Sequence, residues 1–156
     1  MDTTIEPPTQ RVSAREQPAM QGVPRPVGPA GKIRLMWRIL ASFVWIASEL
    51  RRRPLPEVVA GLRERGRGRP GAYVHPRRLG QLVYRVLRLG PWRARCLFTS
   101  MVLYRLLREQ GDEPELVIGL PREPRDKDAH AWIEMDGVDV GPPPGKGRHE
   151  QIARYS

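Results

Sequence analysis

The sequence is nearly free of cysteine: Cys96 is the only one among 156 residues. A single thiol excludes an internal disulfide framework, and this agrees with a cytoplasmic location. It also excludes a zinc site with paired cysteines, because only three histidines could join that thiol at a metal ion. We therefore expect no metal and no cofactor in this protein.

Long hydrophobic runs and phosphate-binding loops are also missing. The most apolar stretch, IRLMWRILASFVWIASELRRR at 33–53, is interrupted by Arg34 and Arg38, and its unbroken part at 39–47 is too short to span a bilayer. The glycine-rich GRGRPG at 66–71 has neither a Lys-Ser/Thr ending nor a strand before it. We expect no integral membrane span and no nucleotide site.

Acidic residues are scarce in the front of the chain. Residues 1–111 hold 21 Lys or Arg against 7 Asp or Glu, whereas residues 112–156 hold 6 against 10. A basic front could attract nucleic acid. However, aromatic residues make up only 6% of the chain and form no recognisable platform for stacking bases. We therefore expect no nucleic-acid partner and interpret the charge as a preference for arginine.

The chain divides into two parts by composition. Residues 1–31 are rich in proline, glycine, serine, threonine and glutamine and show no apolar periodicity, which predicts a disordered segment. This segment also lacks the apolar core of a signal peptide. Residues 32–156 are long enough to build one hydrophobic core. We expect a single domain there.

Apolar residues recur at helical spacing through the first half of this domain. The four predicted helices are 33–53, about 55–64, 77–89 and 96–110. The third is expected to bury a face made of Leu79, Leu82, Val83, Val86 and Leu87. The fourth is expected to bury one stripe, made of Leu97, Met101, Tyr104 and Leu103 or Leu107, and to be capped by Gly111.

Strand patterns follow the helices. ELVIGL at 115–120 is typical of a buried strand, and AHAWIEM at 129–135 alternates between apolar and polar residues. Asp136–Gly137 is a strong hairpin signal, after which 138–140 returns as a strand. Alternation places His130, Trp132 and Glu134 on one face of the second strand.

The order of the elements predicts an α+β fold, with helices over 33–110 and a small antiparallel sheet over 115–141. Residues 142–156 are interpreted as a polar C-terminal tail. His149 lies within GKGRHEQIARYS, a polar stretch that could pack back on the domain, and is expected to have a surface role.

Cys96 stands at the predicted start of a helix, where unpaired backbone N–H groups and a partial positive charge favour the thiolate. The same N–H groups can stabilise an oxyanion. His130 begins a predicted strand, and a strand packed beside that helix could bring the imidazole to within ~3–4 Å of the sulfur. The spacing alone leaves open a nucleophile with its base, or a buried thiol with a packed histidine.

CLFTSMVLYRLLREQGDEPELVIGL followed by AHAWIEMDG resembles the transglutaminase-like domain of lasso-peptide leader peptidases, the split form of the microcin-processing B protein. The shared features are a Cys-Leu that opens a helix, a Leu-Leu-Arg-x-x-Gly helix end, a Leu-Val-Ile-Gly strand, and His-Ala-Trp before an Asp-Gly turn. The detailed match covers roughly residues 90–141. The helices at 33–89 agree only in their Arg- and Leu-rich character.

This resemblance implies a transglutaminase-like, papain-like core that acts as a cysteine peptidase. It implies that the enzyme removes the leader from a ribosomally synthesised precursor peptide, with Cys96 as nucleophile and His130 as general base and acid. It also implies two protein partners, a separate leader-recognition protein that delivers the precursor and a lasso cyclase that uses the product. The helix at 33–53 is hypothesised to form part of the docking surface.

The sequence departs from this family at the third catalytic position. The family tends to place an Asp about twelve residues after the His, where this chain has Pro142. A tight turn at Asp136–Gly137 would pair Glu134 with Asp139, roughly 13–14 Å along the strand from His130 at ~3.4 Å per residue.

Asp139 is our predicted third member, and a bulge or strong twist would be needed to bring it to His130. The alternatives left open are a backbone carbonyl, Asp126, Asp128 and Glu150. The departure also leaves a second hypothesis, that the chain is a non-catalytic transglutaminase-like scaffold or binding module in a peptide-maturation complex.

Overall fold

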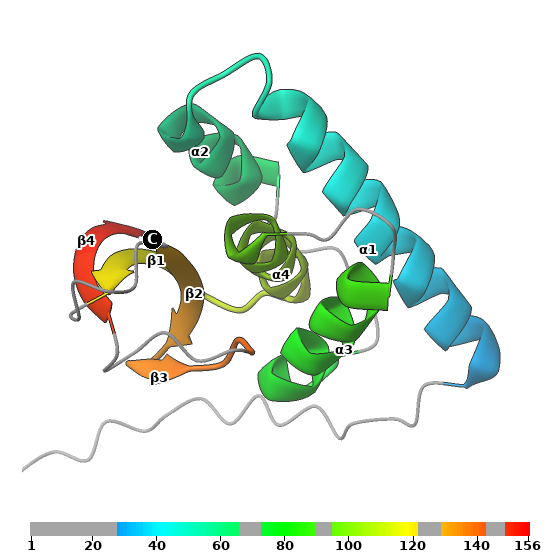
Figure 1. Ribbon diagram of the computed structural model, residues 1–156. Coiled ribbons are helices and arrows are strands. Elements are labelled where there is room, and N and C mark those ends of the chain that lie inside the picture. Colours follow the sequence, from blue (N-terminus) through cyan, green and yellow to red (C-terminus); the bar gives the residue numbers. More distant parts are fainter. Residues whose placement is uncertain (1–27, 66–72, 90–94, 122–128, 143–148) are drawn as a thin grey trace, which may run out of the picture.

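The computed structural model of the chain describes residues 28–65, 73–89, 95–121, 129–142 and 149–156. Helices come first along the chain and strands follow, so the predicted α+β class is confirmed (Figure 1). The helices are α1 (Pro29–Glu49), α2 (Leu55–Arg65), α3 (Pro76–Leu89) and α4 (Cys96–Gln110). The strands are β1 (Glu115–Pro121), β2 (His130–Met135), β3 (Val138–Asp139) and β4 (His149–Tyr155).

The first helix differs from its prediction at both ends. It begins at Pro29, inside the segment predicted to be disordered, because the fixed backbone of proline suits the first turn of a helix. It ends at Glu49, before the predicted end at residue 53. The rest of that segment, residues 1–27, and the linker at 66–71 lie outside the described residues.

The fourth helix lies at the centre of the molecule, enclosed by α1, α2, α3 and the sheet (Figure 1). From Met101 onward its apolar residues are buried on all sides, whereas Leu97 and Phe98 near its start are only partly buried. The buried residues are Met101, Val102, Leu103, Tyr104, Leu106 and Leu107. The predicted one-sided stripe was therefore too narrow, because a helix surrounded by other elements buries its whole circumference. Gly111 caps the helix with a φ of 93°, as predicted.

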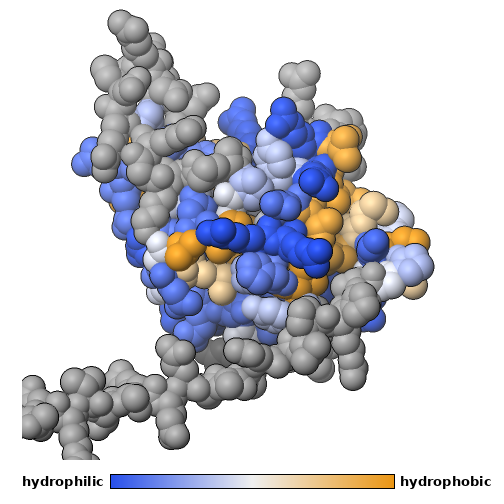
Figure 2. Space-filling model, turned by 90° about the horizontal axis from the view of Figure 1, so that it is seen from below, coloured by the Kyte–Doolittle hydropathy of each residue, from blue (hydrophilic) through white to orange (hydrophobic). Residues whose placement is uncertain are grey.

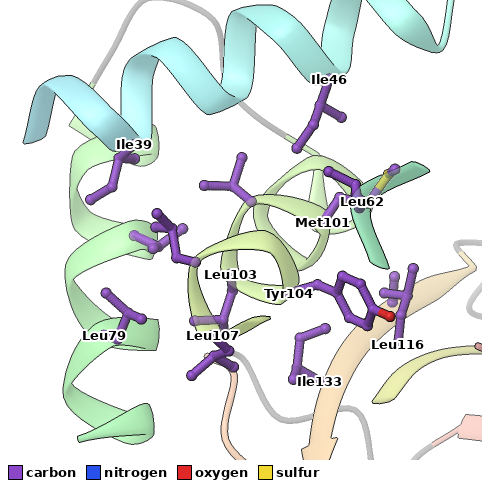
Figure 3. Close-up of a cluster of buried hydrophobic side chains, with 14 of the residues drawn as sticks. Ile39, Ile46, Leu62, Leu79, Met101, Leu103, Tyr104, Leu107, Leu116 and Ile133 are labelled. Atoms are coloured by element: carbon purple, nitrogen blue, oxygen red, sulfur yellow. The ribbon is translucent and has the colours of Figure 1, made fainter. Parts of the chain in front are cut away.

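The core is built around this helix (Figure 3). Ile39 and Ile46 from α1, and Leu62 from α2, meet α4 on one side, and Leu116 and Ile133 of the sheet meet it on another. The face that α3 buries consists of residues four apart, Leu79, Val83 and Leu87. Leu82, predicted to belong to that face, is 40% exposed, because this spacing leaves it on the outer side of α3.

Charged residues tie three helices together beside the core. Arg38 of α1 and Arg105 of α4 both bind the buried carboxylate of Glu109. Burial would raise the pKa of Glu109, but the hydrogen bonds from the two arginines outweigh it and the pKa is lowered. The guanidinium groups of Arg105 and Arg65 each lie 5.0 Å from the ring centroid of Trp45. These contacts link α1, α2 and α4.

The sheet is antiparallel with the strand order β3-β2-β1-β4. The turn between β2 and β3 has positive φ at both Asp136 and Gly137, as a two-residue type I′ hairpin requires. The pairing of Glu134 with Asp139, which the sequence predicted, is confirmed.

The polar tail predicted for 142–156 is wrong in its second half, because β4 pairs with β1 from Leu116 to Pro121. The alternation of residues along β4 is interrupted by a bulge at Ile152. Gln151 and Ala153 pair with Gly119 and Ile118, and Ile152 between them has no partner on β1. An alternating pattern that changes phase within seven residues gives no strand signal in the sequence.

The two faces of the sheet carry different residues. The face toward α4, here called the helix face, consists of Leu116, Ile118, Ala131, Ile133 and Tyr155. The opposite face, here called the histidine face, consists of Val117, Gly119, His130, Trp132, Glu134, His149 and Arg154. Register and alternation together confirm the predicted common face of His130, Trp132 and Glu134.

The outer surface has an apolar region on α1. Ile33, Met36, Trp37 and Val44 of this helix are exposed, with Trp37 at 65%. Figure 2 shows hydrophobic residues gathered on the side of the molecule where α1 begins, beside a larger hydrophilic area. Among the described residues, no helix has the length and apolar character that crossing a membrane requires.

Candidate active site

Cys96 is the first residue of α4, as predicted, and is half-buried. Arg95 before it is extended, and its side chain makes no capping hydrogen bond to the first turn. The first backbone N–H groups of α4 therefore lack the side-chain acceptor that usually occupies this place, and the positive end of the helix dipole lies at the sulfur.

The start of β2 lies beside this helix end. β3 pairs with only the last two residues of β2, and the N–H of Val140 then donates to the carbonyl of Ile133 at 2.9 Å. Further along this edge, the Cys96 sulfur lies 3.6 Å from the carbonyl oxygen of Ala129, and the Ser100 hydroxyl donates to the carbonyl oxygen of Ala131 at 2.8 Å. The Ser100 side chain of α4 thus satisfies a backbone carbonyl of β2 beyond the end of β3.

Ser100 was not considered in the sequence analysis. It lies one helical turn after Cys96 and is buried, so the two residues face the same strand edge. A serine four residues after a cysteine that opens a helix is the only signal the sequence carried for it. The Ser100 hydrogen bond fixes the carbonyl of Ala131, the residue that directly follows His130.

His130 is brought together with Cys96, and the two side chains are hydrogen-bonded. This bond is the largest influence on Cys96 and lowers the pKa of the thiol below its ordinary value. Partial burial of the sulfur opposes the shift, while backbone N–H groups of Ala131 and Leu97 add to it. Cys96 is therefore biased toward the thiolate, the nucleophilic form of a cysteine.

Three rings gather on the histidine face next to this pair. The His130 ring is stacked on that of His149, with centroids 5.0 Å apart and an interplanar angle of 29°. Trp132 lies 6.2 Å from each of the two imidazoles. His149 is half-buried at the start of β4, so the polar tail in which it was predicted to lie is here a strand that packs back on the domain.

Asp139, the predicted third member, lies on β3 opposite Glu134, four residues along β2 from His130. Its carboxylate accepts a hydrogen bond from the N–H of Gly141 at 3.0 Å. Of the other acids considered, Glu150 is exposed on β4, and Asp126 and Asp128 lie outside the described residues.

The far end of the histidine face is a charged network. The indole N–H of Trp132 donates to Glu134 at 2.9 Å, and Arg154 reaches the other oxygen of that carboxylate at 3.1 Å. Arg154 also binds Glu115. Within the part of the chain that is described, no three His, Cys, Asp or Glu side chains are arranged to hold a metal ion.

A comparison with protein-family models matches residues 37–154 to the transglutaminase-like superfamily. The matched region runs from α1 into β4 and so includes Cys96, His130 and His149. No curated protein and no solved structure matches the chain significantly.

Proposed function

Because the chain belongs to the transglutaminase-like superfamily, which includes cysteine peptidases, we propose that it is a cysteine peptidase with Cys96 as nucleophile and His130 as general base and acid. The observation that carries this proposal is the hydrogen bond between the two side chains at the N-terminus of α4, together with the lowered pKa of the thiol. A sulfur placed there is activated by an imidazole and by backbone N–H groups at once.

The reaction follows from these two groups. The thiolate of Cys96 attacks the scissile carbonyl carbon, a C–S bond forms, and the carbonyl oxygen becomes an oxyanion. The C–N bond then breaks, and the amine leaves with the proton of the His130 imidazolium. Neutral His130 next takes a proton from water, whose oxygen attacks the thioester carbon. The C–S bond breaks, which releases the acid and restores the thiolate–imidazolium pair.

For the substrate, we propose the leader of a ribosomally synthesised precursor that becomes a lasso peptide. The support is the resemblance of the segments around Cys96 and His130 to leader peptidases of that pathway. A separate leader-recognition protein and a lasso cyclase are the partners that belong with it, in the cytoplasm. The exposed apolar residues of α1, Trp37 and Val44 among them, are our proposed docking surface for the recognition protein.

The third catalytic member stays a prediction. We retain Asp139 as the proposed third member, although its pairing with Glu134, four residues along β2 from His130, does not support contact with the imidazole. The proline at position 142, where the family tends to have an Asp, favours the second candidate function, a scaffold that binds peptide-maturation proteins without cutting them. The two candidate functions differ in what they require of Cys96.

The deciding experiment follows alkylation of Cys96 by iodoacetamide against pH in the native chain and in His130→Ala. An activated pair predicts fast alkylation well below the ordinary thiol pKa of ~8.5, and a profile that moves to higher pH without the imidazole.

Cys96→Ala should abolish cleavage of the precursor in a reconstituted mixture with the recognition protein. Trp37→Ser should weaken that cleavage only when the recognition protein is present.

His75→Ala is the matched control, because it removes an imidazole on the loop before α3. A thiol that reacts only when the protein unfolds, in the native chain as in His130→Ala, would contradict the peptidase. Maturation that survives Cys96→Ala would favour the scaffold.

A further inference from the structure

We infer that His149 is a positioning residue, whose ring stacks on the His130 imidazole and holds it in the orientation that meets Cys96. The inference rests on the proposed function, because a held imidazole matters only if it acts on the thiol. It names a residue that lies 19 positions from His130 on a different strand, and to which the sequence analysis assigned only a surface role.

A histidine needs such support because of its side-chain geometry. The second side-chain torsion of histidine has broad energy wells, so an imidazole turns unless neighbouring groups hold it. Productive proton transfer tolerates little displacement, since a shift of about 1 Å can cost about 100-fold in rate. His130 is only half-buried at the first position of β2, where the strand alone gives little restraint.

The rings on the histidine face supply this restraint. His149 lies against the His130 ring at 5.0 Å and 29°, within the range of favourable offset stacking. Trp132 lies nearly parallel to His130, at 6.2 Å and 15°, and is itself held by the bond from its indole N–H to Glu134. The imidazole therefore has one aromatic neighbour from its own strand and one from β4.

Gly119 makes the contact between β2 and β4 possible. It lies on β1, between His130 of β2 and the His149 end of β4. A Cβ atom at this position would lie 2.7 Å from the carbonyl oxygen of Glu150, 2.9 Å from the ring of Trp132 and 3.0 Å from the Cβ of His149. Any larger residue would press on both Trp132 and His149, the two aromatic neighbours of His130.

The test compares three substitutions of His149 by the pH profile of Cys96 alkylation. His149→Phe keeps a ring that stacks but cannot titrate, His149→Gln keeps a polar group without a ring, and His149→Ala removes both. Stacking predicts that the Ala and Gln variants alkylate about three- to ten-fold more slowly near pH 6, with midpoints moved to higher pH. The Phe variant should stay within about twofold of the native rate.

The same comparison applies to precursor cleavage, where Ala and Gln should lower kcat while KM stays unchanged. His75→Ala is the matched control, and a thermal melt of each variant shows that the fold is kept. If His149→Ala fails to fold, the contrast between Phe and Gln still decides the question.

Two results would overturn the inference. The first is a His149→Phe variant that alkylates as slowly as the Gln variant, which would assign the effect to the proton chemistry of His149. The second is a native alkylation profile in the Phe, Gln and Ala variants alike. Failure of the proposed function looks different. In that case the native chain itself shows no fast alkylation at low pH and His130→Ala changes nothing.

Discussion

The helix face and the histidine face of the sheet are both closed to solvent in their centres, but by different kinds of contact. On the helix face, Leu116 and Ile133 are fully buried against α4 and contribute apolar area. On the histidine face, Trp132 and Glu134 are nearly as buried, at 3% and 2% exposure, and are joined by a directional hydrogen bond. The helix face therefore depends on how well apolar side chains fill the space against α4, whereas the histidine face depends on the direction of its hydrogen bonds.

Strand β2 supplies both faces by simple alternation. Strands buried on both sides are usually apolar throughout, yet this one carries a histidine and a glutamate. The glutamate is acceptable because Trp132 and Arg154 satisfy its carboxylate, and the histidine is acceptable because it lies at the strand end beside Cys96. Substitutions on the two faces should therefore have separable effects on stability and on the thiol.

The largest expected effect is on the helix face. Ile133→Ala should lower the free energy of unfolding by about 2–5 kcal/mol, because it leaves a cavity against α4. Thermal or urea unfolding measures this loss, and Val138→Ala, a 47% exposed position on the neighbouring strand, is the control with little expected change. The alkylation profile of Cys96 should stay native well below the melting temperature. A displaced profile would mean that the two faces are not separable.

A smaller effect is expected in the middle of the histidine face. Gly119→Ala should cost about 1–3 kcal/mol, because the new methyl group has no space beside Glu150, Trp132 and His149. It should also slow alkylation of Cys96, since relief of the overlap moves His149 away from His130. Unfolding and alkylation are measured on the same preparation.

Gly61→Ala is the matched control for this substitution. This glycine lies within α2 with open space around its Cα, so alanine should stabilise the protein by about 0.5–1 kcal/mol and leave the thiol unchanged. A Gly119→Ala protein with native stability and native alkylation would show that the contact between β1 and β4 is looser than described.

The smallest effect is expected at the strand edge where the two faces meet. Ser100→Ala should cost about 1 kcal/mol in unfolding, because the carbonyl of Ala131 loses its donor. The midpoint of Cys96 alkylation should move slightly upward, since Ala131 also directs its backbone N–H at the sulfur and is held less firmly without the Ser100 hydroxyl. Thr99→Ala is the control, because that hydroxyl bonds to Arg95 at the start of its own helix. Equal losses in the two variants would contradict a special role for Ser100.

Much of the local structure could be predicted because its causes are local. The bounds of α4 follow from the apolar run after Cys96 and from Gly111, whose positive φ ends the helix. The hairpin follows from Asp136–Gly137, which set the pairing of Glu134 with Asp139 through the turn geometry alone. The prediction failed for Leu82 and for the one-sided stripe of α4, where the outcome depends on how many elements surround a helix.

The sequence by itself determined the α+β order, the position of a lone thiol at a helix start, and a histidine on the strand that follows. Only the tertiary structure decided that His149 belongs to the sheet, that its ring reaches His130 across Gly119, and that Ser100 ties α4 to the edge of β2. The reason is physical. Helix ends, turns and alternation are set by neighbours in the chain, whereas contacts between distant segments depend on strand order and on a register that one bulged residue can change.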